Sequence, residues 1–393
     1  MPATPATPFG PEEAKRVRKV LALEPTPLVK LSNIEGLASV HIKDESKRLG
    51  LQAFKVVGGA YAMLRFMCKR LELPANEPED VDKVKLLYQE RFGATTFVTA
   101  TDGNHGRGVA WAAKTFGQRA VVYMPKGSAH QRLQHVLDLG ADAEITDLNY
   151  DDTVEMAFRQ GKEKGWAVLQ DTTAPGYTEI PEWIMQGYTA MVDESIDQMA
   201  PTMPTHVVLQ MGVGSMAAAV VGYLTARLKV HPTFIVMEPK NAACGFKSAQ
   251  EGKLSEVSGD LETMIAGLAC GVPSSIAWPI LHEHVSAFVS LEDEVAGNGM
   301  RMLKKEGVEA GECGGAAAGL LQYVMQAKSG RAAQLREALS LGPESHVLLI
   351  NTEGATDPEN YEKQMGLASA PPAKELLDFV IPAAHRAKRQ RCA

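Results

Sequence analysis

Lys55 is the first residue in this sequence whose type and setting could do chemistry. It lies between Phe54 and Val56, at the start of a helix predicted over about Val56–Cys68. Desolvation and a helix N-terminus both disfavour an ammonium ion, so we expect the pKa of this amine below its ordinary value of about 10.4. An amine of that kind forms Schiff bases with aldehydes. This segment alone leaves open the alternative of a surface lysine with a partly buried stem.

A second segment, TATDGNHGRG, follows a predicted strand at Thr96–Ala100 and opens a predicted helix through Trp111. Backbone N–H groups at such a helix start could hold a substrate carboxylate, and the asparagine could hydrogen-bond a ring hydroxyl. The alternative is a turn in which the aspartate or the asparagine caps the helix. The polar candidates in this loop are Thr101, Asp102, Gly103, Asn104 and His105.

A third segment, HVVLQMGVGSMAAAV, reads as a strand, a glycine turn and an Ala-rich helix. Glycines let backbone N–H groups close around an anion, and the helix N-terminus adds about half a positive charge. The candidate phosphate-binding residues are Gly212, Val213, Gly214, Ser215 and Met216. The same glycines with Ala217 match G-x-G-x-x-A, and Glu238 ends the next strand, so this segment alone also allows a nicotinamide or flavin site, or close packing only.

Taken together, the three segments indicate more than each does separately. A phosphate anchor, a desolvated lysine and an asparagine donor are the groups that pyridoxal phosphate requires.

These segments, in this order, resemble those of the fold-type II pyridoxal-phosphate enzymes, and among these most closely the diaminopropionate ammonia-lyases. The resemblance runs from about residue 43 to 357 and includes long middle motifs that the dehydratases lack. It is carried by KDESKRLGLQAFKVVGGAYA, TATDGNHGRGVAWAA, YMPKGSAHQR, TDLNYDDTV, QDTTAPGYTEIPEWIMQGY, LQMGVGSMAAAVVGYL, MIAGLACGVP and NTEGATD.

The resemblance implies α,β-elimination of 2,3-diaminopropionate, in either enantiomeric form, to pyruvate and two molecules of ammonia. It implies Lys55 as the cofactor lysine and makes Asp102 and Asp171 catalytic acid/bases. Asp102 would take the Cα proton of the D isomer, and Asp171 with Lys55 would serve the L isomer. The physics agrees, because a carboxylate pairs with the second ammonium of diaminopropionate, which serine does not present.

The resemblance also implies contacts to the cofactor and to the substrate carboxylate. The phosphate would lie on the glycine turn Gly212–Met216, Asn104 would bind the cofactor ring, and the Thr101–His105 loop would hold the carboxylate. The family usually places Ser or Thr opposite the pyridine nitrogen, whereas this sequence has Asn351 followed by Thr352. Asn351 could donate its amide N–H to that nitrogen.

Composition excludes several other classes of protein. The chain has 393 residues and a formal charge of −7 without a long basic stripe, which argues against nucleic acid as the main partner. Five cysteines are too few for a disulfide scaffold, and spacing alone cannot show whether Cys244 and Cys270 pair. Val207–Ala226 lacks charge but contains polar residues and glycines, so we interpret it as a strand, turn and helix rather than a membrane span. We therefore expect a cytoplasmic protein.

No metal is required by this chemistry, and His282-x-His284, on a strand-like run, is expected to be a pair of surface residues. Cys313 stands where close relatives have Ser, and the sequence offers no functional explanation for this difference.

Alternating strand and helix patterns predict an α/β fold with two open, mostly parallel twisted sheets flanked by helices. Stretches rich in Pro at Glu72–Lys85 and Ala200–Thr205 look like linkers. We expect a large cofactor-binding domain from residues 1–80 and 190–393, a small domain at 81–189, and disordered tails at 1–11 and 385–393. The family resemblance implies a homodimer.

Three rival functions remain at this point. They are a serine or threonine dehydratase of the same fold, a nicotinamide-dependent oxidoreductase based on the glycine pattern, and a binding or regulatory relative that has lost catalysis, which the presence of Lys55, Asp102 and Asp171 disfavours.

Overall fold

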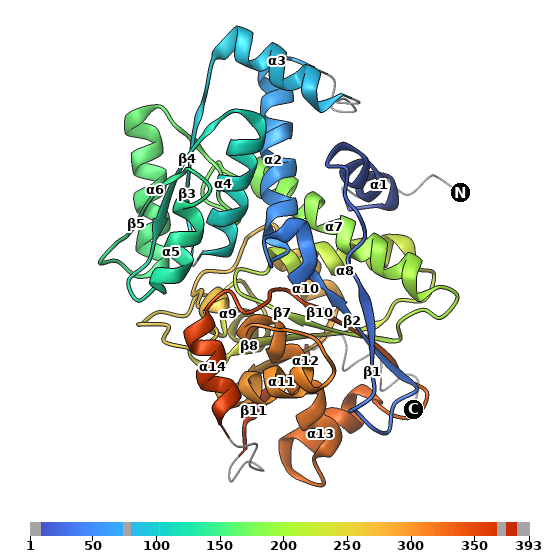
Figure 1. Cartoon of the computed structure of the whole chain (residues 1–393). Coiled ribbons are helices and arrows are strands. Elements are labelled where there is room, and N and C mark those ends of the chain that lie inside the picture. Colours follow the sequence, from blue (N-terminus) through green and yellow to red (C-terminus); the bar gives the residue numbers. More distant parts are fainter. Residues whose placement is uncertain (1–8, 74–79, 102, 368–374, 383–393) are drawn as a thin grey trace. The chain divides into compact units, whose positions relative to one another are not determined.

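The computed structural model describes residues 9–73, 80–101, 103–367 and 375–382 of the chain (Figure 1). The chain divides into two compact units, each described by itself below. The small-sheet unit comprises Phe54–Asp193 with the described part of Met1–Pro25, and the large-sheet unit comprises Thr26–Ala53 with the described part of Glu194–Ala393. The division falls inside helix α7, Glu179–Met199.

The small-sheet unit is built on a four-stranded parallel sheet of order β5-β4-β3-β6. The strands are β3 Thr96–Ala100, β4 Arg119–Met124, β5 Asp142–Ile145 and β6 Ala167–Val168. Its helices are α1 Pro11–Val20, α2 Lys55–Arg70, α3 Val81–Phe92, α4 Asn104–Phe116, α5 His130–Leu137 and α6 Tyr150–Lys164, together with the first part of α7. Apolar residues of β3, among them Val98 and Ala100, pack with Val154 and Ala157 of α6, so the covering helix and the sheet share one core.

The large-sheet unit is built on a seven-stranded sheet of order β1-β2-β10-β7-β8-β9-β11. The five central strands run parallel, and the edge strands β1 and β11 are antiparallel to their neighbours. The strands are β1 Leu28–Leu31, β2 Ser39–Asp44, β7 His206–Gln210, β8 Thr233–Pro239, β9 Val285–Leu291, β10 His346–Asn351 and β11 Leu377–Val380. The helices are α8 Ser215–Arg227, α9 Cys244–Glu251, α10 Ala277–His284, α11 Asp293–Lys305, α12 Glu312–Gln326, α13 Gly330–Leu339 and α14 Pro358–Gly366.

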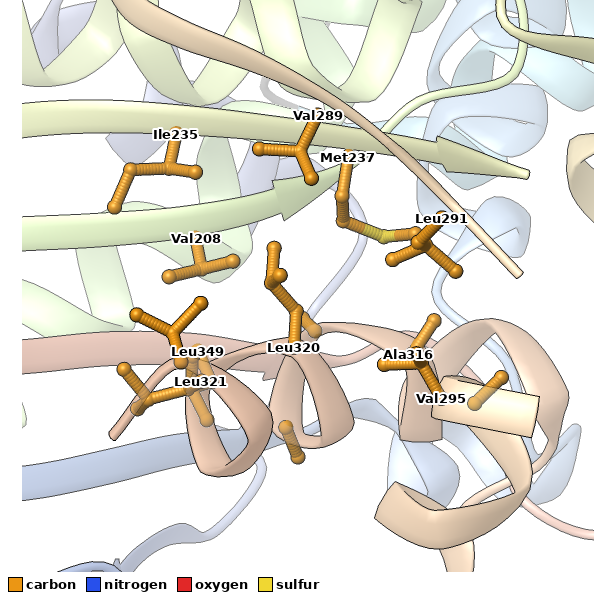
Figure 2. Close-up of a cluster of buried hydrophobic side chains, with 14 of the residues drawn as sticks. Val208, Ile235, Met237, Val289, Leu291, Val295, Ala316, Leu320, Leu321 and Leu349 are labelled. Atoms are coloured by element: carbon orange, nitrogen blue, oxygen red, sulfur yellow. The ribbon is translucent and has the colours of Figure 1, made fainter. Parts of the chain in front are cut away.

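The core of the large-sheet unit lies between its central strands and helices α11 and α12 (Figure 2). Val208, Ile235 and Val289 extend from neighbouring strands towards Leu320 of α12. The two helices pack backbone against backbone, because a Cβ atom at Gly299 would lie 1.9 Å from a carbonyl oxygen of α12. Burying such apolar surface is worth roughly 25 cal/mol per Å² and holds the sheet rigid beneath the loops at its strand ends.

The α/β class and the two mostly parallel sheets are as the sequence predicts. The strands at Thr96–Ala100 and His206–Gln210 have the predicted bounds, and the run at Val207–Ala226 is a strand, a turn and a helix. Within the part of the chain that the structure describes, no helix is both long and apolar enough to cross a bilayer.

Three expectations differ from the structure. The run with His282 and His284 belongs to helix α10, not to a strand, because Trp278, Leu281 and their neighbours follow a helical apolar spacing. The linker expected over Glu72–Lys85 ends early, since Asp80 caps α3 through the N–H of Lys83. The predicted strand at 167–170 stops at Val168.

The first domain crossing, expected near residue 80, also differs from the division into units. Helix α2 belongs to the small-sheet unit because it packs closely on α4: a Cβ atom at Gly108 would lie 2.8 Å from the Cα atom of Val56. The second crossing, expected near 190, lies at Asp193. Of the tails expected to be disordered, residues 1–8 and 385–393 lie outside the described residues, whereas Phe9 is buried and Pro11 opens helix α1, so the expected N-terminal tail is too long.

Candidate active site

Lys55 is the first residue of helix α2, as the sequence predicts within one residue. Two glycines allow α2 to approach α7 closely, since a Cβ atom at Gly187 would lie 2.7 Å from the Cα atom of Gly58. Gly58 is one turn after Lys55, so this contact fixes the end of α2 that carries the amine. The side chain of Lys55 is 19% exposed, which leaves its Nζ atom accessible to a small molecule.

Asp171 lies next to Lys55 and is almost fully buried. Its Oδ2 atom is 3.0 Å from Nζ of Lys55, and its Oδ1 atom faces the side-chain amide of Gln170 at 3.3 Å and the hydroxyl of Tyr150 at 3.5 Å. Burial alone would raise the pKa of Asp171, but the Lys55 ammonium, His105 and the hydrogen bonds outweigh it and lower this pKa from 3.8 to about 2. Asp171 is therefore an ionised carboxylate held against the one amine predicted to bind an aldehyde.

Gln170 holds Asp171 in place after strand β6 ends. Its Oε1 atom accepts the backbone N–H of Ala100, and its Nε2 atom donates to the carbonyl of the same residue, at 2.9 and 3.0 Å. Oε1 also accepts the hydroxyl of Thr99. The side-chain amide thus pairs with β3 where the next residue of a longer strand would pair, and Asp171 follows directly.

The polar loop after β3 opens helix α4, which begins at Asn104 with Gly103 as its N-cap. The hydroxyl of Thr101 accepts the N–H of Gly103 at 2.9 Å, so Thr101 shapes the loop. Asn104 and His105 are buried, and neither caps the helix, so the simple capped turn is not what Asn104 forms. Asp102 lies outside the described residues.

His105 joins this loop to the segment that carries Asp171. Its Nε2 atom is 2.9 Å from the carbonyl of Leu169, which can only accept, so Nε2 carries the hydrogen. Its Nδ1 atom is 4.0 Å from Oδ2 of Asp171. Within the small-sheet unit the structure therefore brings Lys55, Asp171 and His105 together.

In the large-sheet unit, β7 leads into the glycine turn and α8 begins at Ser215. Gly214 has φ of 99°, a conformation that side-chain-bearing residues rarely adopt. A Cβ atom at Gly212 would lie 3.1 Å from Sγ of Cys270, so this turn also lacks room for a side chain. The turn presents backbone N–H groups at the start of a 13-residue helix, which is the arrangement that binds phosphate.

Asn351 and Thr352 follow strand β10 in the same unit. Both hydrogens of the Asn351 amide are used, because Nδ2 donates to Oδ1 of Asp44 at 2.8 Å and to the carbonyl of Glu309 at 2.9 Å. Asn351 therefore has no N–H left for a pyridine nitrogen. The hydroxyl of Thr352 is buried and, among the described residues, has no hydrogen-bond partner. Of the two residues, Thr352 is the one with a donor to spare.

Comparisons with known proteins agree with this arrangement. Residues 20–353 match the family model described as pyridoxal-phosphate dependent enzyme. The chain is 43% identical over 375 residues to the diaminopropionate ammonia-lyase of Escherichia coli strain K12, covering 90% of this chain and 92% of the relative. It is 45% identical over 352 residues to the enzyme of that name from Salmonella typhimurium, covering 86% and 87%.

A crystal structure of the Escherichia coli diaminopropionate ammonia-lyase in complex with D-serine superposes with a TM-score of 0.85 at 40% identity, covering 92% of this chain and 93% of that one. The chain belongs to the diaminopropionate ammonia-lyase family of pyridoxal-phosphate-dependent enzymes. This membership overturns the nicotinamide reading of the glycine pattern.

The residues of this family member fit its cofactor. The glycine turn presents bare backbone N–H groups at the start of α8 for a phosphate, and Thr352 has an unused buried hydroxyl. Glu238, the acid that a dinucleotide site would need, is unavailable, because its two oxygens accept the N–H groups of Gly245 and Phe246 at 2.7 Å each. Cys244 and Cys270 are buried free thiols.

No group of three or more His, Cys, Asp or Glu within the described ranges is arranged to hold a metal ion. Cys313 is buried, and its carbonyl accepts Nε2 of Gln210 at 2.9 Å, so its backbone helps to hold the strand end before the glycine turn.

Sequence reasoning missed three residues near Asp171 and the start of α2: Gln170, Tyr150 and Tyr188. The first two contact Asp171, and the third is a buried phenol beside α2. A signal existed for Gln170, since a buried polar residue at a strand end, directly before a candidate site aspartate, needs a partner in the sheet. Tyr150 and Tyr188 had no signal, because only the packing of α6 and α7 brings them near.

Proposed function

We propose that this chain catalyses α,β-elimination of 2,3-diaminopropionate with one water, giving pyruvate and two molecules of ammonia. The observation that carries the proposal is the pair formed by the Lys55 amine and the buried, ionised Asp171 carboxylate at 3.0 Å. An amine for an aldehyde cofactor and a base next to it are the two groups that the reaction needs.

Lys55 is the residue that binds the aldehyde of pyridoxal phosphate. When bound, this cofactor draws electrons from the substrate's Cα atom, so that a proton and then the β-amino group can leave. The turn Gly212–Met216 would hold the cofactor phosphate through backbone N–H groups, and Asn104 would bind the cofactor ring. Thr352, whose hydroxyl is unused, would supply the donor to the pyridine nitrogen in place of Asn351.

Asp171, assisted by Lys55, removes the Cα proton of the L isomer. Its buried position keeps water away from the carboxylate, and Gln170 and Tyr150 orient its second oxygen. Loss of the positive charge on Lys55 would remove the interaction that lowers the pKa of Asp171, so this pKa would rise towards the range of a useful base.

Asp102 takes the Cα proton of the D isomer, and the loop Thr101–His105 holds the substrate carboxylate. The support for Asp102 is its place in the family motif, directly before Gly103 and Asn104. A carboxylate there also pairs with the second ammonium of diaminopropionate and gains nothing from the hydroxyl of serine.

The test is an assay of pyruvate and ammonia with D- and L-diaminopropionate and with both isomers of serine. We expect two ammonia per pyruvate from diaminopropionate and a strong preference for it over serine. A strong preference for serine would instead favour the dehydratase reading. Borohydride treatment of the yellow holoenzyme should fix the cofactor mass on the peptide that contains Lys55, and labelling on another lysine would contradict the assignment.

We also propose a homodimer in the cytoplasm. The dimer rests on the family resemblance, and the compartment on the free thiols of Cys68, Cys244, Cys270 and Cys313, which suit a reducing environment. Light scattering at micromolar concentration and fractionation of cells test the two statements.

A further inference from the structure

Arg132 is a buried arginine of helix α5 whose side chain lies against the polar loop that opens helix α4. It is only 3% exposed. A Cβ atom at Gly103 would lie 3.1 Å from both Cβ and Cδ of Arg132, so the stem of Arg132 crosses directly over this glycine. Gly103 has φ of 141°, a conformation that glycine alone adopts readily. Position 103 therefore needs glycine twice, for its backbone and for this contact.

The backbone of Gly103 is fixed on both sides of the contact. Its N–H donates to the hydroxyl of Thr101 at 2.9 Å, and its carbonyl accepts the N–H of Arg107 at 2.8 Å. Helix α4 begins at the next residue, and among the described residues no side chain caps it and no acidic residue lies in its first turn. The stem of Arg132 is thus a third constraint on the residue from which α4 starts.

The charged groups around Arg132 carry more positive than negative charge. Burial lowers the pKa of His135, as do Arg107 and, to a lesser degree, Arg132, whereas Asp138 raises it. Because these effects together favour the neutral imidazole, the four side chains contribute two permanent cations and one anion. The anion, Asp138, is exposed. This side of the loop is therefore suited to a further anion.

Packing alone does not explain an arginine at position 132. A methionine would place the same kind of apolar stem over Gly103 without the cost of taking a guanidinium out of water. A charge at this depth is useful where an anion has to bind, because a buried charge is little screened by salt or water. The anion that the proposed reaction brings to this loop is the α-carboxylate of the substrate.

We propose that Arg132 is a positioning residue for the substrate. Its stem fixes Gly103 at the start of α4, and its permanent charge strengthens the hold of the loop on the α-carboxylate, equally for both isomers of diaminopropionate. The inference rests on the proposed function, because it requires the loop Thr101–His105 to hold this carboxylate.

The first test measures the binding of alanine and of alaninamide to the full-length holoenzyme by absorbance. Alanine has the amine and the α-carboxylate of the substrate but no β-amino group to lose, and alaninamide has a neutral amide in place of the carboxylate. Arg132→Met keeps an apolar stem and removes the charge, so the Kd for alanine should rise about tenfold and the Kd for alaninamide should stay within about twofold. Arg132→Lys keeps stem and charge and should bind alanine within about threefold of the parent.

The matched control is Gln134→Met, on the exposed side of the same helix. The amide of Gln134 donates to Asp138 at 2.7 Å, and both residues are exposed, so both Kd values should stay at those of the parent. Unchanged alanine binding in Arg132→Met would overturn the inference, because the stem alone would then account for the contact. Equal weakening of alanine and alaninamide would also overturn it. If Arg132→Met does not fold, Arg132→Gln provides the same neutral comparison.

The second test compares kcat and KM of Arg132→Met for D- and L-diaminopropionate. Both isomers carry the same carboxylate, so KM should rise about tenfold for each while kcat changes little. A loss confined to the D isomer would mean that the charge acts on Asp102, which precedes Gly103 in the chain, and would overturn the inference. Failure of the parent to form pyruvate from diaminopropionate would overturn the proposed function, whereas the alanine and alaninamide affinities overturn only the role of Arg132.

Discussion

Asp171 in the small-sheet unit and Glu238 in the large-sheet unit are both buried carboxylates, and their pKa values move in opposite directions. Asp171 faces the Lys55 ammonium, which outweighs burial and lowers its pKa to about 2. Glu238 accepts two backbone N–H groups and faces the thiol of Cys244, and burial raises its pKa to about 8.

The difference shows which kind of polar group each unit contributes. At Glu238 two backbone N–H groups do not offset desolvation of the carboxylate, whereas at Asp171 the Lys55 ammonium, together with His105 and hydrogen bonds, does. The small-sheet unit therefore holds charged side chains that can exchange protons. The large-sheet unit presents backbone N–H groups at its glycine turn. Its buried carboxylate, Glu238, instead holds the start of α9 by accepting the N–H groups of Gly245 and Phe246.

Replacing Lys55 by alanine should have the largest effect on this comparison. We expect kcat for both isomers to fall about 10⁴-fold, since the variant loses both the covalent link to the cofactor and a proton carrier. Pyruvate formation and borohydride labelling measure the two losses. Lys69→Ala is the control, because Lys69 lies on the same helix, is exposed and pairs with exposed Glu179. A comparable loss in the control would mean that α2, not the amine, is what the first variant damaged.

Asp171→Asn should come next in size and should depend on the isomer. Turnover of the L isomer should fall about 10²- to 10⁴-fold, because an amide cannot accept the proton, and turnover of the D isomer should fall less. Asp102→Asn should show the reverse order, with the D isomer more affected. Equal losses for the two isomers in either variant would contradict the division of labour between these aspartates.

Glu238→Gln tests the other carboxylate through stability rather than turnover. Its folded-state pKa of about 8 lies above the ordinary 4.5, so its contribution to stability is full below pH 4.5 and is lost as pH rises through 8. Glutamine does not titrate. Relative to the parent, the free energy of unfolding of the variant should therefore improve by up to about 2 kcal/mol between pH 6 and pH 8.

Urea unfolding at the two pH values measures this difference. If the difference in free energy of unfolding between variant and parent is the same at pH 6 and pH 8, Glu238 is ionised at both pH values, like Asp171. For Asp171 the sign is opposite: its contribution is present above pH 3.8 and is lost as pH falls towards 2.

Gly214→Ala should have the smallest effect and should act on cofactor affinity. A side chain at φ of 99° strains the turn by about 1–2 kcal/mol, so we expect the Kd for pyridoxal phosphate to rise about tenfold. Absorbance titration of the cofactor-free protein measures it. Gly342→Ala is the control, because that glycine has ordinary φ and open space around its Cα atom. Unchanged affinity in Gly214→Ala would argue that the turn does not bind the phosphate.

Much of this arrangement could be predicted from the sequence because it depends on local patterns. The apolar run before Gly212 fixes β7, and the glycines after it fix the turn, so both lie where the sequence places them. The start of α2 near Lys55 follows from the Ala- and Gly-rich run after it.

The rest depends on contacts between distant segments. Asp171 meets Lys55 only because β6 pairs with β3 and α2 packs on α4 and α7. The use of both Asn351 hydrogens depends on Asp44 and Glu309, which lie far away in the sequence. A single sequence gives residue types and spacing. Neither shows which hydrogen-bond donors are already used by distant segments.

The carboxamide of Gln170 takes the place of a peptide group. It forms two hydrogen bonds with the backbone of Ala100 beyond the last residue of β6 and so extends the pairing with β3. Asp171, the proposed base next to Gln170, thereby gains the rigidity of a sheet while lying in an irregular segment. Glutamate at position 170 would place an anion against the Ala100 carbonyl and lose the hydrogen bond that Nε2 donates there. The single amide nitrogen of Gln170 therefore keeps the segment before Asp171 attached to the sheet.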